Sequence, residues 1–263
     1  MVERAQLEAF RLANNELSRM VKAELAAFFA SLNLDRPESA RDALVAFVPL
    51  LVDQYGAVAG TMAAEFYEEM RASSGATGRF TALAADGVPT EAVEAKVRHT
   101  AGHLWTPEPA AMLSPLLTST DKYVKQPARN TVAFNAKRER VRWARVPTGA
   151  KTCSFCLVMA SRDAKFLSEK SAGGGDLKDK FHGECDCEAV RIGDSEDYPE
   201  GYLPDDYYSM YDTSRKLANS DDPAVRAFRE SLDPKDKNKD LKTTVFAMRR
   251  NFPDVVKDGV HTH

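Results

Sequence analysis

The sequence has 263 residues, of which 36 are Lys or Arg and 39 are Asp or Glu, so its formal net charge is -3. This length is enough for one large domain or two ordinary domains with a real core. A net charge so close to neutral gives no electrostatic reason to require a nucleic-acid partner. The most apolar run, Ala43–Ala64, contains Pro49, Asp53 and Gln54, which favours a buried helix over a membrane span. Because no charged and then apolar leader opens the chain, we expect a soluble cytoplasmic protein with reduced thiols and no membrane partner.

Two long helices are predicted at the start of the chain, because apolar residues recur there at helical spacing. The stripe of the first helix consists of Phe10, Leu17, Val21, Leu25, Phe28 and Leu32, and Asn33 with the Asp35–Pro37 turn ends it. The second helix begins at 37–39, and its seam consists of Leu44, Val48, Leu51, Tyr55, Val58, Met62 and Phe66. Pro49 should bend this helix, and Gly56 and Gly60 would allow a neighbour to approach closely.

Helical patterns continue through the middle of the chain. One helix is predicted from Thr90, as its N-cap, to Leu104. Two more are predicted over Ala110–Val124 and Ala128–Arg140, with an interruption at Pro127. Core packing is the expected role of these apolar stripes.

Basic residues gather just before the first cysteine. Arg138, Arg140, Arg142 and Arg145 could contact the phosphates of a nucleic acid, with Trp143 as a stacking neighbour. The same pattern also fits a solvated helix end whose cations face the negative end of the helix dipole. The sequence leaves both interpretations open.

All four cysteines lie in two short segments, Cys153–Cys156 and His182–Cys187. A structural zinc ion takes four nitrogen or sulfur ligands in a tetrahedron. Five candidates are present, so one of them should lie outside the coordination sphere: Cys153, Cys156, His182, Cys185 and Cys187. Two disulfides, or a redox-active CxxC pair, are the competing interpretations. A site with four protein ligands has no open position for substrate, which favours a structural role for the metal.

After the cysteines the chain returns to helix. Short strands are predicted at Ala164–Ser168 and Ala189–Ile192, an acidic loop follows, and helices are predicted at Tyr207–Ala218, Pro223–Ser231 and Leu241–Arg250. The predicted fold is therefore mainly α, in three parts. These are a helical arm region (1–141), a small zinc-stapled α+β unit that we call the knob (142–195), and the acidic loop with the C-terminal helices (196–263).

Several segments around the cysteines together resemble the MuF-like minor head proteins of tailed phages, in particular those of actinobacteriophages. They are Gln126–Thr131, Arg142–Pro147, Cys153–Cys156, Met159–Arg162, Phe181–Cys187 and Met248–Pro253. The resemblance extends over roughly Lys122–Pro253. Where the family often has a proline and a basic residue in the second cysteine segment, this chain has Gly183, Glu184 and Asp186, which alters the local charge and the stiffness of the turn.

The resemblance implies a minor capsid or head-morphogenesis protein with a helical N-terminal part. Such proteins are present in few copies inside the procapsid, are associated with the portal, and are implicated in head assembly and in the passage of DNA. The expected partners are therefore the portal protein and the major capsid or scaffolding protein, with DNA as a further candidate. The expected location is the head interior, and the host cytoplasm during assembly.

Two rivals from other functional classes compete with this hypothesis. One is a protease or nuclease of head maturation that uses the Cys/His cluster; it would need an open metal position or an activated Cys–His pair. The sequence has neither a GxSxG nor an HExxH signature, so we expect no enzymatic activity. The other rival is a zinc-stabilised module that binds nucleic acid through the basic run.

Overall fold

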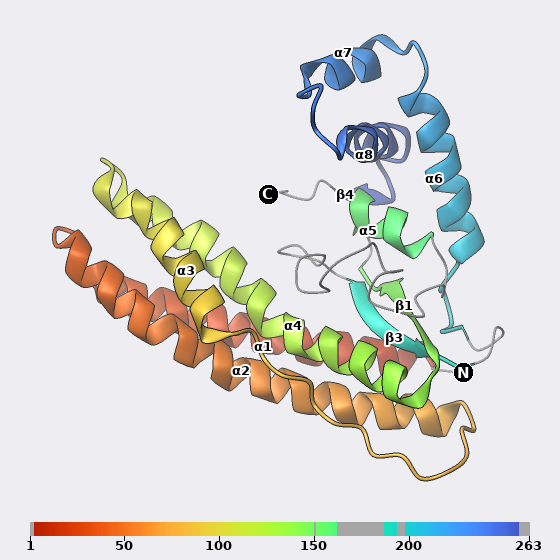
Figure 1. Ribbon diagram of the computed structural model, residues 1–263, viewed down its shortest axis with the longest axis horizontal. Coiled ribbons are helices and arrows are strands. Elements are labelled where there is room, and N and C mark those ends of the chain that lie inside the picture. Colours follow the sequence, from red (N-terminus) through yellow and green to blue (C-terminus); the bar gives the residue numbers. More distant parts are fainter. Residues whose placement is uncertain (1–2, 150, 162–186, 194–197, 258–263) are drawn as a thin grey trace.

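A computed structural model describes residues 3–149, 151–161, 187–193 and 198–257. Helices dominate these residues, which confirms the prediction of a mainly α fold. Figure 1 shows a long helical arm that leads into a smaller body, where the strands and the C-terminal helices gather. The predicted strand at Ala164–Ser168 and the acidic residues Asp194, Glu196 and Asp197 lie outside the described residues.

Three helices build the arm: α1 (Arg4–Ala30), α2 (Pro37–Ser73) and α4 (Leu113–Glu139). The central helix is α4, which packs against both α1 and α2. The two helices predicted at the start of the chain are therefore confirmed, and the break between them lies at 31–36, where Asn33 and the Asp35–Pro37 turn were predicted to end the first helix. Their apolar stripes form one cluster in the far half of the arm, which includes Val21, Leu25, Leu44 and Leu51, and a second cluster in the half that meets the strands.

The hydropathy of α2 has a structural explanation. By length and composition it is apolar enough to cross a membrane, and 50% of its most apolar window is buried inside the fold. That buried half packs against α1, α3 and α4. A core helix with neighbours on three sides needs this composition.

Close packing of α2 on α4 depends on the two glycines singled out in the sequence. A Cβ atom at Gly56 would lie 3.2 Å from Cγ of Pro127, and one at Gly60 would lie 3.7 Å from Cβ of the same proline. The predicted close approach is therefore confirmed. The predicted interruption at Pro127 is wrong, because α4 continues through this residue and its ring packs into the space beside Gly56.

The predicted seam of α2 needs one correction. Val58 is 44% exposed, whereas Leu51 and Phe66 of the same seam are buried. The neighbouring helices cover a face of α2 that turns away from Val58, and the small residues Ala59 and Ala63 fill that face instead.

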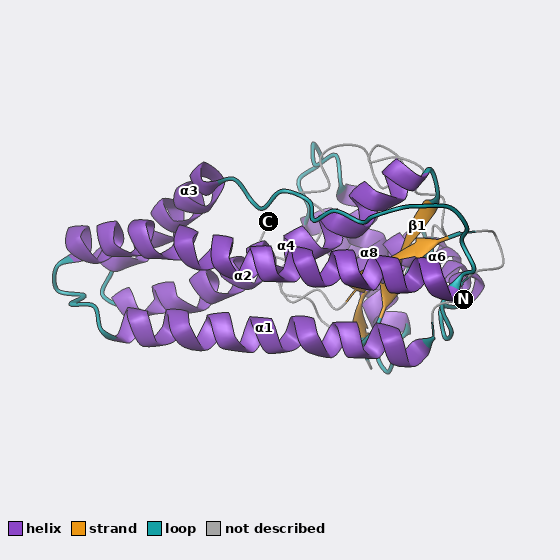
Figure 2. Cartoon of the chain, turned by 90° about the horizontal axis from the view of Figure 1, so that it is seen from below, coloured by secondary structure: helices purple, strands orange, loops and turns teal. Residues whose placement is uncertain are grey.

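A long crossing segment (residues 76–89) returns the chain from the end of α2 to α3 (Thr90–Thr100), along the side of the arm (Figure 2). Its backbone is held by side chains: the Asn135 amide accepts from the N–H of Leu83 at 3.0 Å and donates to the carbonyl of Leu83 at 2.7 Å. The 3-10 turns η1 (Ala101–Trp105) and η2 (Pro109–Met112) then lead into α4. The helix predicted over Thr90–Leu104 thus becomes 3-10 in its last turn, and Thr90 is its first residue, after the N-cap Pro89.

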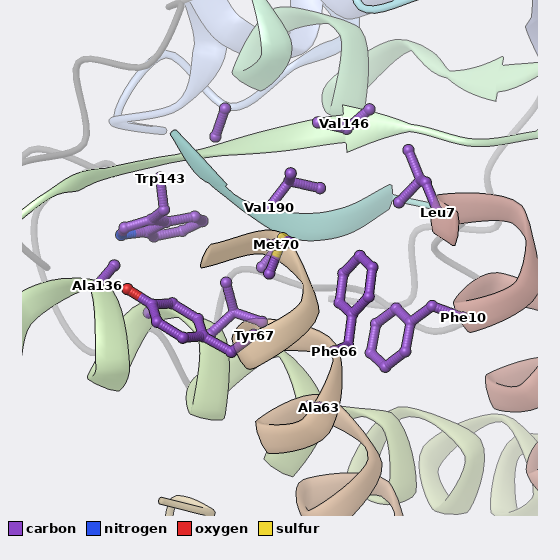
Figure 3. Packing of buried hydrophobic residues seen from close by; sticks show 14 of the residues in the cluster. Leu7, Phe10, Ala63, Phe66, Tyr67, Met70, Ala136, Trp143, Val146 and Val190 are labelled. Atoms are coloured by element: carbon purple, nitrogen blue, oxygen red, sulfur yellow. The ribbon is translucent and has the colours of Figure 1, made fainter. Parts of the chain in front are cut away.

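Two antiparallel strands join the arm to the rest of the protein. β1 (Arg142–Pro147) pairs with β3 (Cys187–Ile192), with Arg142 opposite Ile192 and Pro147 opposite Cys187. The predicted strand at Ala189–Ile192 is confirmed, whereas β1 was not predicted, because its arginines were interpreted as a surface run. Figure 3 shows Trp143, Val146 and Val190 packed over Leu7, Phe66 and Met70 of the arm. The predicted boundary at 141/142 therefore falls inside a shared hydrophobic core.

The C-terminal helices are α6 (Pro204–Ala218), α7 (Pro223–Ser231) and α8 (Lys239–Asn251). α6 and α8 pack against the short helix that carries the CxxC segment, α5 (Ser154–Ala160), and α7 packs against α6 and α8. Leu157 and Val158 of α5 pack with Val245 and Met248 of α8, and Tyr207 and Tyr211 of α6 lie against them. A short parallel pair, β2 (Thr152–Cys153) with β4 (Val256–Lys257), fixes the end of the chain beside α5. The C-terminal helices therefore pack onto the body of the protein through their aromatic and apolar residues.

Candidate metal centre

The CxxC segment sits at the beginning of α5. Cys153 ends strand β2 and is the N-cap residue of α5, and its Sγ accepts a hydrogen bond from the backbone N–H of Cys156 at 3.3 Å. A thiolate accepts such bonds more strongly than a thiol, and a helix N-terminus favours the negative charge. The local geometry therefore suits a metal-binding thiolate at Cys153.

Cys187 approaches this pair from strand β3. It lies opposite Pro147 of β1, and it packs with Cys153 and Cys156 in one cluster in which all three side chains are fully buried. Among the residues that the structure describes, none of the three forms a disulfide. Phe155 covers the cluster from one side.

The structure thus brings together three of the five predicted ligands. His182 and Cys185 lie outside the described residues. Within the ranges that the structure describes, no group of three or more His, Cys, Asp or Glu side chains is arranged to hold a metal ion. The three cysteines are in contact as a packed cluster, and a complete ligand set is not found among the described residues alone.

Two residues of the basic run lie in the core. Arg145 is fully buried in β1, and Trp143 is 4% exposed and covers the end of the arm (Figure 3). Neither side chain reaches the surface, so phosphate contact by Arg145 and base stacking by Trp143 do not fit this fold.

The other arginines of the run lie near the end of α4. Arg138 donates to the carbonyl of Thr81 at 2.9 Å and lies over the ring of Phe80, so it helps to hold the crossing segment. Arg140 caps α4 in the left-handed conformation, with φ of 62°, and is exposed, and Arg142 is half-buried. Of the four arginines predicted to contact nucleic acid, Arg138, Arg140 and Arg142 therefore remain at least partly exposed.

A buried ion-pair network lies beside this run, and sequence reasoning did not find it. Arg191 of β3 donates to the two carboxylate oxygens of Glu139 through Nε and Nη2, at 2.7 and 2.8 Å. Arg71 of α2 donates to the same carboxylate at 2.7 Å, and the Tyr67 hydroxyl donates at 2.6 Å. The single acid in a basic run was the only sequence signal of this network.

The network sets the ionisation of its members. Burial acts to raise the pKa of Glu139, but the hydrogen bonds from Arg191, Tyr67 and Arg71 outweigh it and lower this pKa to about 2. Burial and the bond to the Glu139 carboxylate together raise the pKa of Tyr67. Glu139 therefore stays ionised and joins α2, α4 and β3 at the base of the arm.

Comparison with known proteins places this chain in a family. The Gene 15 protein of Mycobacterium phage D29 is 28% identical to it over 121 residues, which cover 35% of this chain and 44% of that protein, so less than half of the relative is represented. No solved structure matches the chain significantly. The model of the family described as VG15 protein matches residues 1–214, most of the chain, and the protein therefore belongs to this family of phage proteins.

Proposed function

We propose that this protein is a non-enzymatic component of the phage head, associated with the portal, whose helical arm makes the partner contact. Its membership of the VG15 family and its similarity to a mycobacteriophage protein support a role in the virion or in its assembly. The resemblance to MuF-like minor head proteins supports the finer assignment to the portal, with the major capsid or scaffolding protein as a further neighbour.

The observation that carries this proposal is the exposure of several apolar side chains on the arm. Leu50 is 70% exposed and Val58 is 44% exposed, two helical turns apart on α2, and Leu12 and Met20 of α1 are 54% and 43% exposed. Long amphipathic helices with apolar residues at such spacing commonly bind partner proteins. The packing of α2 on α4 keeps this surface in a fixed shape.

Charge substitutions on the arm test the proposal. Leu50→Asp with Val58→Asp should reduce incorporation into procapsids and co-purification with the portal ring, while the far-UV circular dichroism stays unchanged because both side chains are exposed. Tyr208→Asp is the matched control, since Tyr208 is 58% exposed on α6, far along the chain from the arm. Normal incorporation of the arm variant would contradict the assignment of the contact to this surface. Peptide or DNA turnover by the purified protein would instead support the enzyme hypothesis.

The buried cysteines support a structural zinc site as part of this proposal. Cys153, Cys156 and Cys187 supply up to three thiolates, and His182 and Cys185 are the candidates for the remaining position. Zinc bound there would link α5 to β3 and stabilise a segment with little apolar core of its own.

Metal analysis tests the zinc site directly. Protein purified without a metal-affinity step should contain about one zinc per chain, and Cys153→Ser or Cys156→Ser should lower both the zinc content and the melting temperature. His99→Ala is the control, because His99 is exposed on α3. A metal-free, fully folded wild-type protein with reactive thiols would rule out the site.

A further inference from the structure

A pocket of about 410 Å³ lies between α5 and the C-terminal helices α6, α7 and α8. Its buried residues are Val158 of α5, Ala218 of α6, and Thr243 and Thr244 of α8. Arg215, Asn219 and Asp240 also line it and are exposed, so they lie toward solvent. The pocket thus combines a buried, mostly uncharged inner surface with a charged opening.

The cations of this pocket have unused hydrogen-bonding capacity. Arg229 donates one N–H to the carbonyl of Ala218 at 2.8 Å, and a guanidinium has five N–H donors in all. Among the residues that the structure describes, neither Arg215 nor Arg229 lies within ion-pair distance of a carboxylate. Two guanidinium groups in one pocket without a carboxylate partner favour an anionic ligand.

The threonine hydroxyl groups of the inner surface are not available to donate hydrogen bonds to an anionic ligand. Thr243 and Thr244 each donate to a backbone carbonyl of their own helix at 2.8 Å, so their protons are already used. The donors that remain toward a ligand are therefore the two guanidinium groups, the Asn219 amide and the Tyr211 hydroxyl. Asp240 adds a negative charge near the opening, which weakens the binding of any simple anion.

The size and walls of the pocket indicate more than a bare ion. Ligand pockets of roughly 300–1,000 Å³ hold small organic molecules. The Tyr211 ring with Val158 and Leu241 offers apolar contact for an organic body, and the arginines offer forked donors for an oxyanion. We infer that this pocket binds a phosphate group carried on a small organic body of nucleotide size, through Arg215 and Arg229. The phosphate could come from a free nucleotide or from a nucleic-acid strand.

Calorimetric titration of the full-length protein separates these sources. The probes are inorganic phosphate, adenosine 5′-monophosphate, a short single-stranded oligonucleotide and glutamate. Adenosine monophosphate should bind saturably and more tightly than inorganic phosphate if the free nucleotide is the source, whereas preferential binding of the oligonucleotide would identify a strand. Equal binding of glutamate and the phosphates would overturn the assignment to phosphate, and so would a lack of saturable binding by every phosphate probe.

Substitutions then locate the binding. Arg215→Gln should weaken the binding of the preferred phosphate probe about tenfold or more, because one charge-assisted hydrogen bond contributes that much to the affinity. The substitution should not affect folding, because Arg215 is exposed. Arg229→Gln should also weaken binding of the probe. The melting temperature of this variant shows whether loss of the hydrogen bond to Ala218 also destabilises the fold. Asp240→Asn should tighten binding several-fold. Arg226→Gln on α7 is the matched control, because Arg226 is exposed and does not line the pocket. Unchanged binding in Arg215→Gln, or equal loss in Arg226→Gln, would place the ligand elsewhere.

Discussion

Arginines of the same chemical type have different roles near the end of α4: some form ion pairs, and others are exposed. Arg191 and Arg71 both form ion pairs with the carboxylate of Glu139. Arg140, the residue that follows Glu139 in the chain, is exposed. The difference arises from where the end of α4 meets β3 and α2. A buried carboxylate with three donors is costly to disturb, because removing one partner leaves the other charges without compensation.

Glu139→Gln should therefore destabilise the protein by about 3 kcal/mol at pH 7, measured by urea unfolding. The effect should depend on pH, because the native pKa of Glu139 is lowered from 4.5 to about 2. The stabilisation by the carboxylate is complete above about pH 5 and is lost as the pH falls toward 2, so the gap between wild type and variant should narrow between pH 7 and pH 3. Glu65→Gln, exposed on α2, is the control and should unfold like wild type at both pH values. A gap that widens in acid would contradict the ion-pair network.

The exposed arginines at the end of α4 give a second prediction at this scale. If they contact DNA, Arg140→Gln with Arg142→Gln should weaken binding and lower the slope of log affinity against log salt by about 2, since each lost phosphate contact removes about 0.9. Arg36→Gln, exposed at the other end of the arm, is the control. A DNA affinity that changes neither with the salt concentration nor in the double variant would exclude this surface as a DNA contact.

Secondary-structure elements are positioned mainly by small residues and by side chains that bond to backbone. α2 and α4 approach closely because Gly56 and Gly60 leave room for Pro127, and the crossing segment is fixed because Asn135 bonds both backbone groups of Leu83. The proline inside α4 removes one backbone donor, and close packing with α2 offsets the loss.

Gly56→Leu should separate α2 from α4 and lower the free energy of unfolding by about 1–3 kcal/mol, because the added atoms meet Pro127 within 3.2 Å of the new Cβ. Ala57→Leu is the matched control, since Ala57 is exposed at the next position of the same helix, and its effect should stay within about 0.5 kcal/mol. Chemical denaturation measures both. Equal stability of Gly56→Leu and wild type would show that the interface repacks without cost.

At the scale of the whole molecule, the arm and the body share a core. Leu7, Phe66 and Met70 of the arm belong to the same cluster as Trp143, Val146 and Val190 of the two strands (Figure 3). An arm that folded and melted independently of residues 142–195 would have to break this cluster.

We therefore expect one cooperative unfolding transition. Trp105 is 50% exposed and Trp143 is 4% exposed, so in a Trp105→Phe variant the fluorescence reports the strand region alone. Its denaturation curve should coincide with the far-UV circular dichroism curve, which reports mainly the helices. Separate midpoints would instead show that the arm and the knob unfold independently.

The sequence by itself determined the helical arm, the strand at Ala189–Ile192, the use of Gly56 and Gly60, and the grouping of Cys153 with Cys156. Each of these follows from a local pattern, since helical periodicity, turn residues and short spacings are set by neighbours in the chain. The three C-terminal helices were predictable for the same reason, within a few residues of their ends.

Only the tertiary structure decided which charged residues are buried. Arg140 and Arg145 belong to the same run of basic residues in the sequence. In the structure, Arg145 lies in the core because β1 pairs with β3, whereas Arg140 is the C-cap of α4. The meeting of Cys187 with the CxxC segment, the continuation of α4 through Pro127 and the pocket among α6, α7 and α8 likewise depend on contacts between distant segments. The burial of a charged residue is set by which element covers it in the packed chain, and the local sequence around Arg145 does not show that.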